Sequence, residues 1–232
     1  MRKRATTAIT TALFVISLPL LLLAASIWGA ATSHWLYTSG FERNAVAGAT
    51  GLSRAELDSL ARSLIGYFKN GDEYVQVRLE PGGPPVDFFT PEELVHFRDV
   101  KRLFRLDFRV MVATATYVAG YAAFHLWRRD PRERRTLARH TLAGSGLTLG
   151  LLGLLGITAA LDFNWLFLQF HYLAFSNEYW AAEGRMLELF PGAFWYDTVI
   201  GLLAAVAGAA ALAGGGAGAY LWRARRRENR GR

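Results

Sequence analysis

The sequence contains no cysteine, which excludes a disulfide framework and any zinc or iron–sulfur site built on thiolates. Charged residues are almost absent from four long runs of 20 to 25 positions, where apolar residues gather. A helix of that length crosses roughly 30 Å of hydrocarbon. The pI of about 10 would suggest a nucleic-acid binder. The four apolar runs argue against that class and against a soluble helical repeat, and they predict an integral membrane protein.

The four runs are Ala8–Thr32, Phe108–Trp127, Thr141–Leu161 and Thr198–Trp222. The first follows a basic stub, as a signal sequence does, but it is longer than the roughly 7–15 apolar residues of a signal core, so we expect a retained anchor. The third and fourth runs contain Gly146-x-x-x-Gly150 and Gly214-x-x-x-Gly218, a spacing that favours close helix packing.

Basic residues are concentrated in the stub before residue 8, the loop 128–139 and the tail from residue 223. These three segments hold 15 Lys and Arg against three acids, whereas the remainder holds 11 against 16. Because short loops rich in Lys and Arg stay cytoplasmic, we expect a multi-pass plasma-membrane protein with both termini inside. The tail is then a stop-transfer anchor, and no nucleic-acid partner is expected.

The first segment expected outside, residues 33–107, has the patterns of a small folded domain. Ser53-x-x-Glu56 is a capping box. Apolar residues follow it at helical spacing, at Leu57, Leu60, Leu64 and Phe68. Alternation over residues 75–79, a Pro- and Gly-rich turn at residues 81–85 and a returning stretch at residues 86–89 predict a β-hairpin. We therefore predict a small α+β extracytoplasmic domain.

A strong helix start follows at Thr90-Pro91-Glu92-Glu93, with Thr as N-cap, Pro at the first position and acids near the positive end of the dipole. Nothing breaks the pattern before Asp130-Pro131. We expect one helix that begins outside the bilayer and continues through it as the second span.

The second outer segment, residues 162–197, contains Phe163–Phe175, which is apolar but too short to cross. We predict a re-entrant or interfacial segment. The fold class is thus an all-α membrane protein with four transmembrane helices, the outer α+β domain and this segment. The organisation is a stub and first span over 1–32, the outer domain over 33–107, spans two and three with the basic loop over 108–161, the re-entrant segment over 162–197, and span four with the tail over 198–232.

Two of the five histidines, His96 and His171, lie among aromatic residues in segments that meet the same leaflet. Polar groups at that depth tend to mark sites, and an imidazole can take and give a proton near neutral pH. A structural hydrogen bond is the other explanation for each. Asp99, one turn after His96, could orient its ring or could pair with neighbouring cations. His34, His125 and His140 lie in wet flanking positions and need no functional role.

Several enzyme signatures are missing. The chain has no His-Glu-x-x-His and no Gly-x-Ser-x-Gly. An intramembrane CAAX-protease-like hydrolase would use Glu-Glu-x-x-x-Arg, but Arg98 comes one residue late after Glu92-Glu93, a rotation of about 100° on a helix. Position 175, four residues after His171, is phenylalanine rather than an amide or acid. We therefore rank this class below the others.

With those residues in view, the sequence resembles the Lit family, the lipoprotein intramolecular transacylases of bacterial membranes. The matching segments are Phe88–Lys101, with its acidic helix start and His-Phe-Arg-Asp-Val-Lys, and Phe170–Trp180, with Phe-His and Phe-Ser-Asn-Glu-Tyr-Trp. The four spans with one large insertion after the first agree over the whole length. The sequence departs from the family at Glu183-Gly184, where an Asp-Pro pair tends to occur.

The resemblance implies an acyltransferase that moves the sn-2 acyl chain of a diacylglyceryl-cysteine to the α-amino group of that cysteine. The product is an N-acyl, S-monoacylglyceryl lipoprotein, the lyso-form. Diacylglyceryl-modified lipoproteins and membrane lipid would be the partners, without a cofactor or metal. The alternative is a membrane sensor or binding protein in which the histidines are structural.

In the transacylase hypothesis, His96 and His171 are the catalytic acid–base pair at the outer interface, with their roles interchangeable at this stage. Oxyanion stabilisation or orientation would come from Asp99, Lys101, Arg98, Asn177 and Glu93. An apolar substrate groove would be lined by Phe88, Phe97, Phe167, Phe170, Phe175 and Trp180. The sequence does not indicate an oligomeric state.

Overall fold

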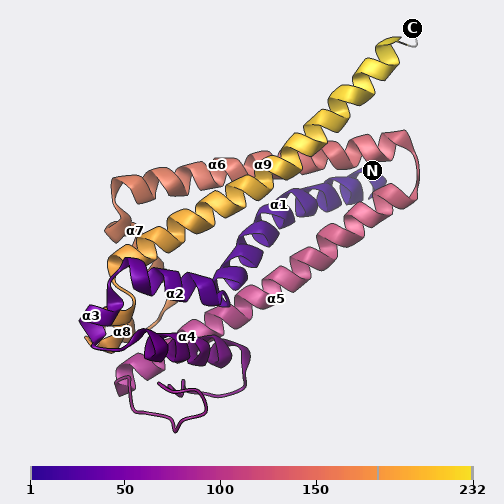
Figure 1. The fold of residues 1–232 in the computed structure, drawn as a ribbon. Coiled ribbons are helices and arrows are strands. Elements are labelled where there is room, and N and C mark those ends of the chain that lie inside the picture. Colours follow the sequence, from indigo (N-terminus) through magenta and orange to yellow (C-terminus); the bar gives the residue numbers. More distant parts are fainter. Residues whose placement is uncertain (1, 182, 231–232) are drawn as a thin grey trace. The chain divides into compact units, whose positions relative to one another are not determined.

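The computed structural model describes residues 2–181 and 183–230 (Figure 1). Residues 1, 182 and 231–232, which fall in the predicted stub, outer segment and tail, lie outside the described residues. The helices are α1 Arg2–Ala31, α2 His34–Arg43, α3 Val46–Thr50, α4 Arg54–Lys69, α5 Pro91–Trp127, α6 Pro131–Leu161, α7 Phe163–Ala174, the 3₁₀ turn η1 Tyr179–Ala181, α8 Arg185–Leu189 and α9 Gly192–Arg230.

Four of these helices are long and apolar enough to cross a membrane: α1 from Thr7 to Ala31, α5, α6 and α9. The predicted four spans are confirmed, and the chain is a multi-pass helical membrane protein. By its contacts the chain forms two compact units. The first unit combines Met1–Ser26, Phe108–Ile157 and Leu202–Arg232, and the second combines Ile27–Asp107 and Thr158–Gly201.

Within the first unit, small residues allow close helix contacts, though not at all the predicted positions. A Cβ on Gly144 of α6 would lie 3.0 Å from Leu18 of α1, and one on Gly214 of α9 would lie 2.9 Å from Ser145. Gly146 and Gly150, by contrast, have open space beside them. The contacts therefore use Gly144 rather than the predicted Gly146-x-x-x-Gly150 pair.

The same unit gives His125 and His140 local partners. His125 Nδ1 lies 2.7 Å from Glu133 Oε2, and His140 Nδ1 lies 2.8 Å from the Tyr121 hydroxyl. Both contacts join α5 to α6 near their connecting loop, which accounts for these two histidines structurally.

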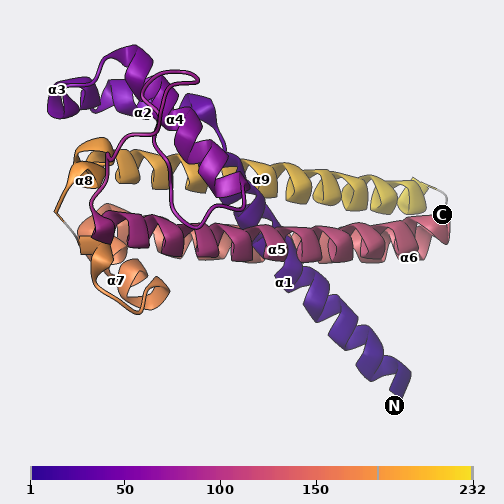
Figure 2. The same cartoon turned by 90° about the horizontal axis from the view of Figure 1, so that it is seen from below.

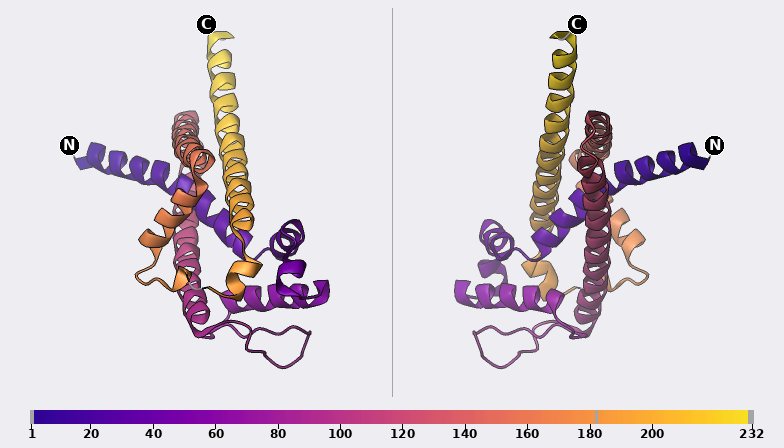
Figure 3. Two further views of the ribbon diagram at one scale, coloured as in Figure 1. Left: turned by 90° about the vertical axis from the view of Figure 1, so that its left-hand side faces the viewer. Right: turned by 90° about the vertical axis from the view of Figure 1, so that its right-hand side faces the viewer.

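The second unit has an apolar core organised by α4. The capping box is present, because the Ser53 hydroxyl accepts from Glu56 N–H and the Glu56 carboxylate accepts from Ser53 N–H. The predicted stripe faces inward, with Leu60 and Leu64 completely buried. Helix α2 packs on α4, and α3 packs on α8, as Figure 3 shows from two sides. The helix covers a protein core, so its amphipathic face does not need a membrane surface.

The predicted α+β domain is wrong, because the described residues of this unit contain no β-strand. The expected hairpin is reduced to one antiparallel bridge, in which Val77 C=O accepts from Val86 N–H at 2.9 Å. Pro84 and Pro85 lack the N–H groups that would extend the ladder. Arg78 N–H instead donates to the Ser63 hydroxyl of α4 at 3.2 Å, so the segment packs on a helix. The alternation still marks its buried side, since Val75 and Val77 are in the core.

Helix α5 begins at Pro91 and runs without a break to Trp127, as predicted (Figure 2). The Thr90 hydroxyl accepts from Glu93 N–H at 3.2 Å, and the Glu93 carboxylate accepts from Thr90 N–H at 2.8 Å. These reciprocal bonds form a second capping box. The start of α5 at Pro91 is thereby fixed five residues before His96.

Candidate active site

His96 and His171 come together in the second unit. Their ring centroids are 6.2 Å apart and their planes differ by 27°. His96 comes from the second turn of α5 and His171 from the third turn of α7. Each of the two residues is only 7% exposed. Two segments separated by 75 positions in sequence thus place two imidazoles side by side in a buried setting.

The His171 ring has a defined tautomer. Its Nδ1 lies 2.7 Å from the backbone carbonyl oxygen of Phe167, one turn earlier on α7. A carbonyl only accepts, so Nδ1 carries the hydrogen and donates it. In the neutral ring Nε2 then holds the lone pair. His171 therefore presents Nε2 as a proton acceptor.

The His96 ring is placed differently. Its Nδ1 is buried and has no hydrogen-bond partner among the described residues. A buried polar atom without a partner is costly, by about 1–3 kcal/mol. The Asp99 carboxylate does not relieve this cost, because its oxygens are bonded to Asn177 and Arg102 instead. His96 is thus a buried imidazole with unused hydrogen-bonding capacity.

Aromatic side chains enclose the pair. Ring centroids lie 4.1 Å from His171 for Phe167, 5.3 Å for Phe170 and 5.0 Å for Trp180. Phe175 contacts both histidines, at 4.8 Å from His96 and 5.5 Å from His171. We call these four residues the aromatic cage. Of the six predicted groove residues, these are the ones that contact the histidines.

The remaining two predicted groove residues lie elsewhere. Phe97 is in the apolar core, with its ring 4.6 Å from Phe89. Phe88 also packs against Phe89, and the Arg185 guanidinium lies 5.1 Å from its ring. Both support the start of α5 rather than the histidine pair.

Burial controls the protonation of His171. Desolvation lowers the pKa of this imidazole below its ordinary value of 6.5, and the bond to the Phe167 carbonyl opposes the shift more weakly. His96 lies beside it, so charging both rings would also place two positive charges close together. His171 is consequently a neutral base at neutral pH.

Glu93 is completely buried, and both of its oxygens accept backbone N–H groups. Oε2 accepts from Thr90 at 2.8 Å, and Oε1 accepts from Met186 at 2.6 Å. Gly184 lies against the carboxyl group, where an added Cβ would be 2.5 Å from Oε1. This carboxylate therefore joins α5 to the start of α8.

Asp99 joins α5 to the residues that follow α7, ahead of α8 in the chain. Its Oδ2 accepts from Asn177 Nδ2 at 2.9 Å, and Asn177 Oδ1 accepts from Tyr179 N–H at 3.1 Å. The predicted pairing with a neighbouring cation is also present, because Arg102 donates to Oδ1 at 3.1 Å.

The two other predicted oxyanion residues point away from the histidines. Lys101 Nζ donates to Asn70 Oδ1 at 2.9 Å and to the Asp72 carbonyl at 2.7 Å, and it lies 3.8 Å from the centre of the Tyr67 ring. Arg98 donates to Glu73 and to the Tyr74 hydroxyl. Both cations hold the loop after α4.

Gly184 and Met186 are the site residues that the sequence reasoning missed. Gly184 was visible only as a departure from a family pattern, and the part of Met186 that matters is its backbone N–H.

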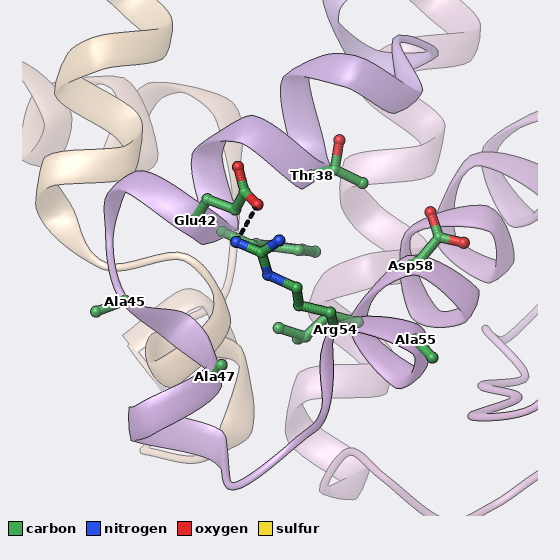
Figure 4. Close-up of a pocket in the computed structure, with 9 residues that line it drawn as sticks. Thr38, Glu42, Ala45, Ala47, Arg54, Ala55 and Asp58 are labelled. Carbon is green, nitrogen blue, oxygen red and sulfur yellow. Dashed lines mark ion pairs between the residues drawn. The ribbon is translucent and has the colours of Figure 1, made fainter.

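A separate cavity of about 480 Å³ lies between α2 and α4, where Arg54 pairs with Glu42 across its mouth (Figure 4). None of the predicted site residues lines it. No cluster of three or more His, Asp or Glu side chains able to hold a metal occurs within the described ranges.

The fold and the site together define a class: a multi-pass helical membrane protein with a buried histidine pair inside an aromatic cage. The family model of the lipoprotein intramolecular transacylase Lit matches residues 12–195. The chain belongs to this family, whose name denotes an acyltransferase activity. Comparison with curated proteins gives no significant match.

Solved structures agree in fold. The in meso structure of the lipoprotein intramolecular transacylase Lit from Bacillus cereus has a TM-score of 0.83 and 20% sequence identity, covering 96% of this chain and 99% of that chain. Two further in meso structures of that protein carry a histidine replaced by arginine or by alanine. Each has a TM-score of 0.77 at 19% identity, and each covers 97% of this chain. At this identity the likeness shows a shared fold.

Proposed function

We propose that the protein transfers the sn-2 acyl chain of a diacylglyceryl-cysteine to the α-amino group of the same cysteine, using His171 as the acid–base catalyst and His96 to stabilise the oxyanion. The observation that carries this proposal is the caged pair itself, in which His171 is a neutral base with Nε2 available. Diacylglyceryl-modified lipoproteins are the substrates, and the lyso-form lipoprotein is the product.

The reaction joins two groups of one molecule, so the site mainly holds a reactive conformer and moves one proton. The neutral amine attacks the ester carbonyl and forms the new C–N bond. His171 Nε2 takes the proton that the nitrogen loses. The ester C–O bond then breaks, and the same proton passes to the glycerol oxygen. An N–H of His96 steadies the tetrahedral oxyanion, which gives its unused hydrogen-bonding capacity a role.

The apolar surface of α7 supports a lipid-anchored substrate. Phe170 is 52% exposed although its ring contacts His171, and Tyr172 and Leu173 are 60% and 89% exposed. Acyl chains can lie on this surface while the ester reaches the histidines. The cage residues Phe167 and Phe175 exclude water from the reacting groups, which strengthens the electrostatic interactions there.

The distribution of charge supports an active site on the extracytoplasmic side, with both termini in the cytoplasm. The segments that carry His96 and His171 belong to the acidic part of the sequence, and the short basic segments belong to the other side. Lipoprotein cysteines modified with diacylglycerol are held at that outer interface in the proposed reaction.

The test replaces each histidine in a strain that expresses a diacylglyceryl lipoprotein. His96→Ala and His171→Ala are expected to abolish the lyso-form, read by mass spectrometry of the N-terminal lipopeptide. His34→Ala is the matched control, because His34 is in the same unit, 42% exposed and paired with Asp58. Lyso-form in both site variants would contradict the catalytic roles. Its absence with the wild type would contradict the transacylase proposal and favour a binding protein.

A further inference from the structure

Two described stretches after α7, residues 175–181 and 183–186, are bonded to α5 on both sides of His96, and we call them the connecting segment. Asp99, one turn after His96, holds Asn177 at 2.9 Å. Glu93, one turn before His96, holds the N–H of Met186 at 2.6 Å. Residues three positions apart are neighbours on a helix surface, so Glu93 and Asp99 flank His96 on its two sides, about 120° apart around the axis. One face of α5 therefore presents an imidazole between two carboxylates that grip the same connecting segment.

This connecting segment also supplies aromatic contacts to both histidines. Phe175 precedes Asn177 by two residues and contacts His96. Trp180 follows it by three residues, lies in η1 and contacts His171. The two cage residues thus lie close to the bonded points, and their positions depend on where those bonds hold the chain.

The bond from Glu93 is set by a close fit. The carboxyl group is completely buried, its two oxygens accept one backbone N–H each, and Gly184 fills the space beside it. A Cβ at position 184 would lie 2.5 to 2.9 Å from three atoms of the carboxyl group. Neither partner can enlarge without moving the connecting segment.

We propose that Glu93, together with Gly184, is a positioning pair that fixes the connecting segment over the histidines and thereby holds Trp180 against His171, with Asp99–Asn177 as the second fixed point. The pair acts through the cage and does not touch the substrate. The inference concerns the proposed catalytic site, but its principal readout requires no activity.

The readout is the contact between Trp180 and His171. A protonated imidazole quenches indole fluorescence on contact, so emission from Trp180 reports the titration of His171. The difference between the wild type and Trp180→Phe isolates this signal from the other tryptophans. Among the described residues, the titratable side chain in ring contact with His171 is His96, and Glu93, Asp99 and Arg102 are the charged groups on the facing part of α5.

The experiment titrates purified full-length protein in detergent, comparing Gly184→Ala and Glu93→Gln with the wild type, each against the same variant carrying Trp180→Phe. Both variants are expected to reduce the Trp180-dependent quenching and to move its midpoint up toward pH 6.5, because a displaced Trp180 lets water reach His171. The matched controls are Gly192→Ala, where an added Cβ meets no atom within 4 Å, and the exposed neighbour Glu92→Gln. Both controls should titrate like the wild type.

Wild-type quenching and midpoint in folded Gly184→Ala and Glu93→Gln would overturn the proposal. If neither variant folds, judged by circular dichroism, Glu93→Asp, whose shorter side chain weakens the bond to Met186 N–H, is read in the same way and gives the same decision. In the lipopeptide assay, kcat should fall by roughly tenfold to a hundredfold with a smaller change in KM, because a displacement of about 1 Å can have that effect. If the wild type makes no lyso-form, the proposed function is wrong. The fluorescence titration still tests whether Glu93 and Gly184 position Trp180.

Discussion

At the scale of single residues, the proposed reaction requires His171 to be unprotonated, so that it can accept the proton from the substrate amine. Burial lowers its pKa below the ordinary 6.5, so the ring stays neutral as the pH falls through that value and is lost as a base only below it. The amine is a second requirement, with a pKa of about 7.7–8.0. We expect the logarithm of the rate to fall with a slope of one below about pH 8. The slope should steepen to two only below pH 6.5.

This profile is measured with the lipoprotein in detergent, and helical circular dichroism at each pH separates loss of the base from acid unfolding. Steepening above pH 6.5 in folded protein would show that His171 is not the buried base described above. Phe170→Ala is a useful comparison, because it opens the cage to water and should move the steepening upward.

At the scale of elements, α4 carries the core of the second unit. Leu60 is completely buried on the face that packs within that core. Leu60→Ala leaves a cavity, which we expect to destabilise the unit by about 2–5 kcal/mol. The change should appear as a lower unfolding temperature in detergent. Leu187→Ala on α8, where the side chain is 49% exposed, is the control and should shift the temperature far less.

The elements that local sequence determines were predicted well, because their signals lie within a few residues. The capping boxes at Ser53 and Thr90 fixed the starts of α4 and α5. The predicted hairpin is wrong because Val75 and Val77 lie in the core with α4, and Arg78 N–H bonds to Ser63 of that helix, 15 positions earlier. Alternation of apolar residues does not distinguish packing on a helix from pairing with a strand. The short helices α2 and α3 carry weak patterns and were not predicted.

The same division holds within the site. His96, His171 and four aromatic neighbours could be found from sequence, because polar residues within apolar segments are conspicuous. The hydrogen-bond partners of Lys101 and Arg98 lie in the loop after α4, and only the tertiary fold brings this loop to α5. The fit of Gly184 against Glu93 joins positions 91 residues apart, and a glycine carries no signal of its partner.

At the scale of the whole molecule, the absence of cysteine makes the orientation directly measurable. Glu80→Cys lies in the exposed loop before α5. Arg132→Cys lies at the exposed start of α6, next to the basic loop. A membrane-impermeant thiol reagent applied from the extracytoplasmic side should label the first variant in intact cells and the second only after permeabilisation. The unsubstituted chain is the background control, and the reverse pattern would invert the proposed topology.

Helix α7 leaves Leu173 and Tyr172 uncovered next to a histidine that is itself almost fully enclosed. For a substrate held by two acyl chains, this arrangement removes the need to pass through water. Encounter then becomes lateral diffusion within one leaflet, and the concentration that matters is the fraction of lipid molecules that are substrate. In the proposed reaction, dilution of the substrate by other lipids of the leaflet, and not by the aqueous phase, sets how often an ester reaches the histidines.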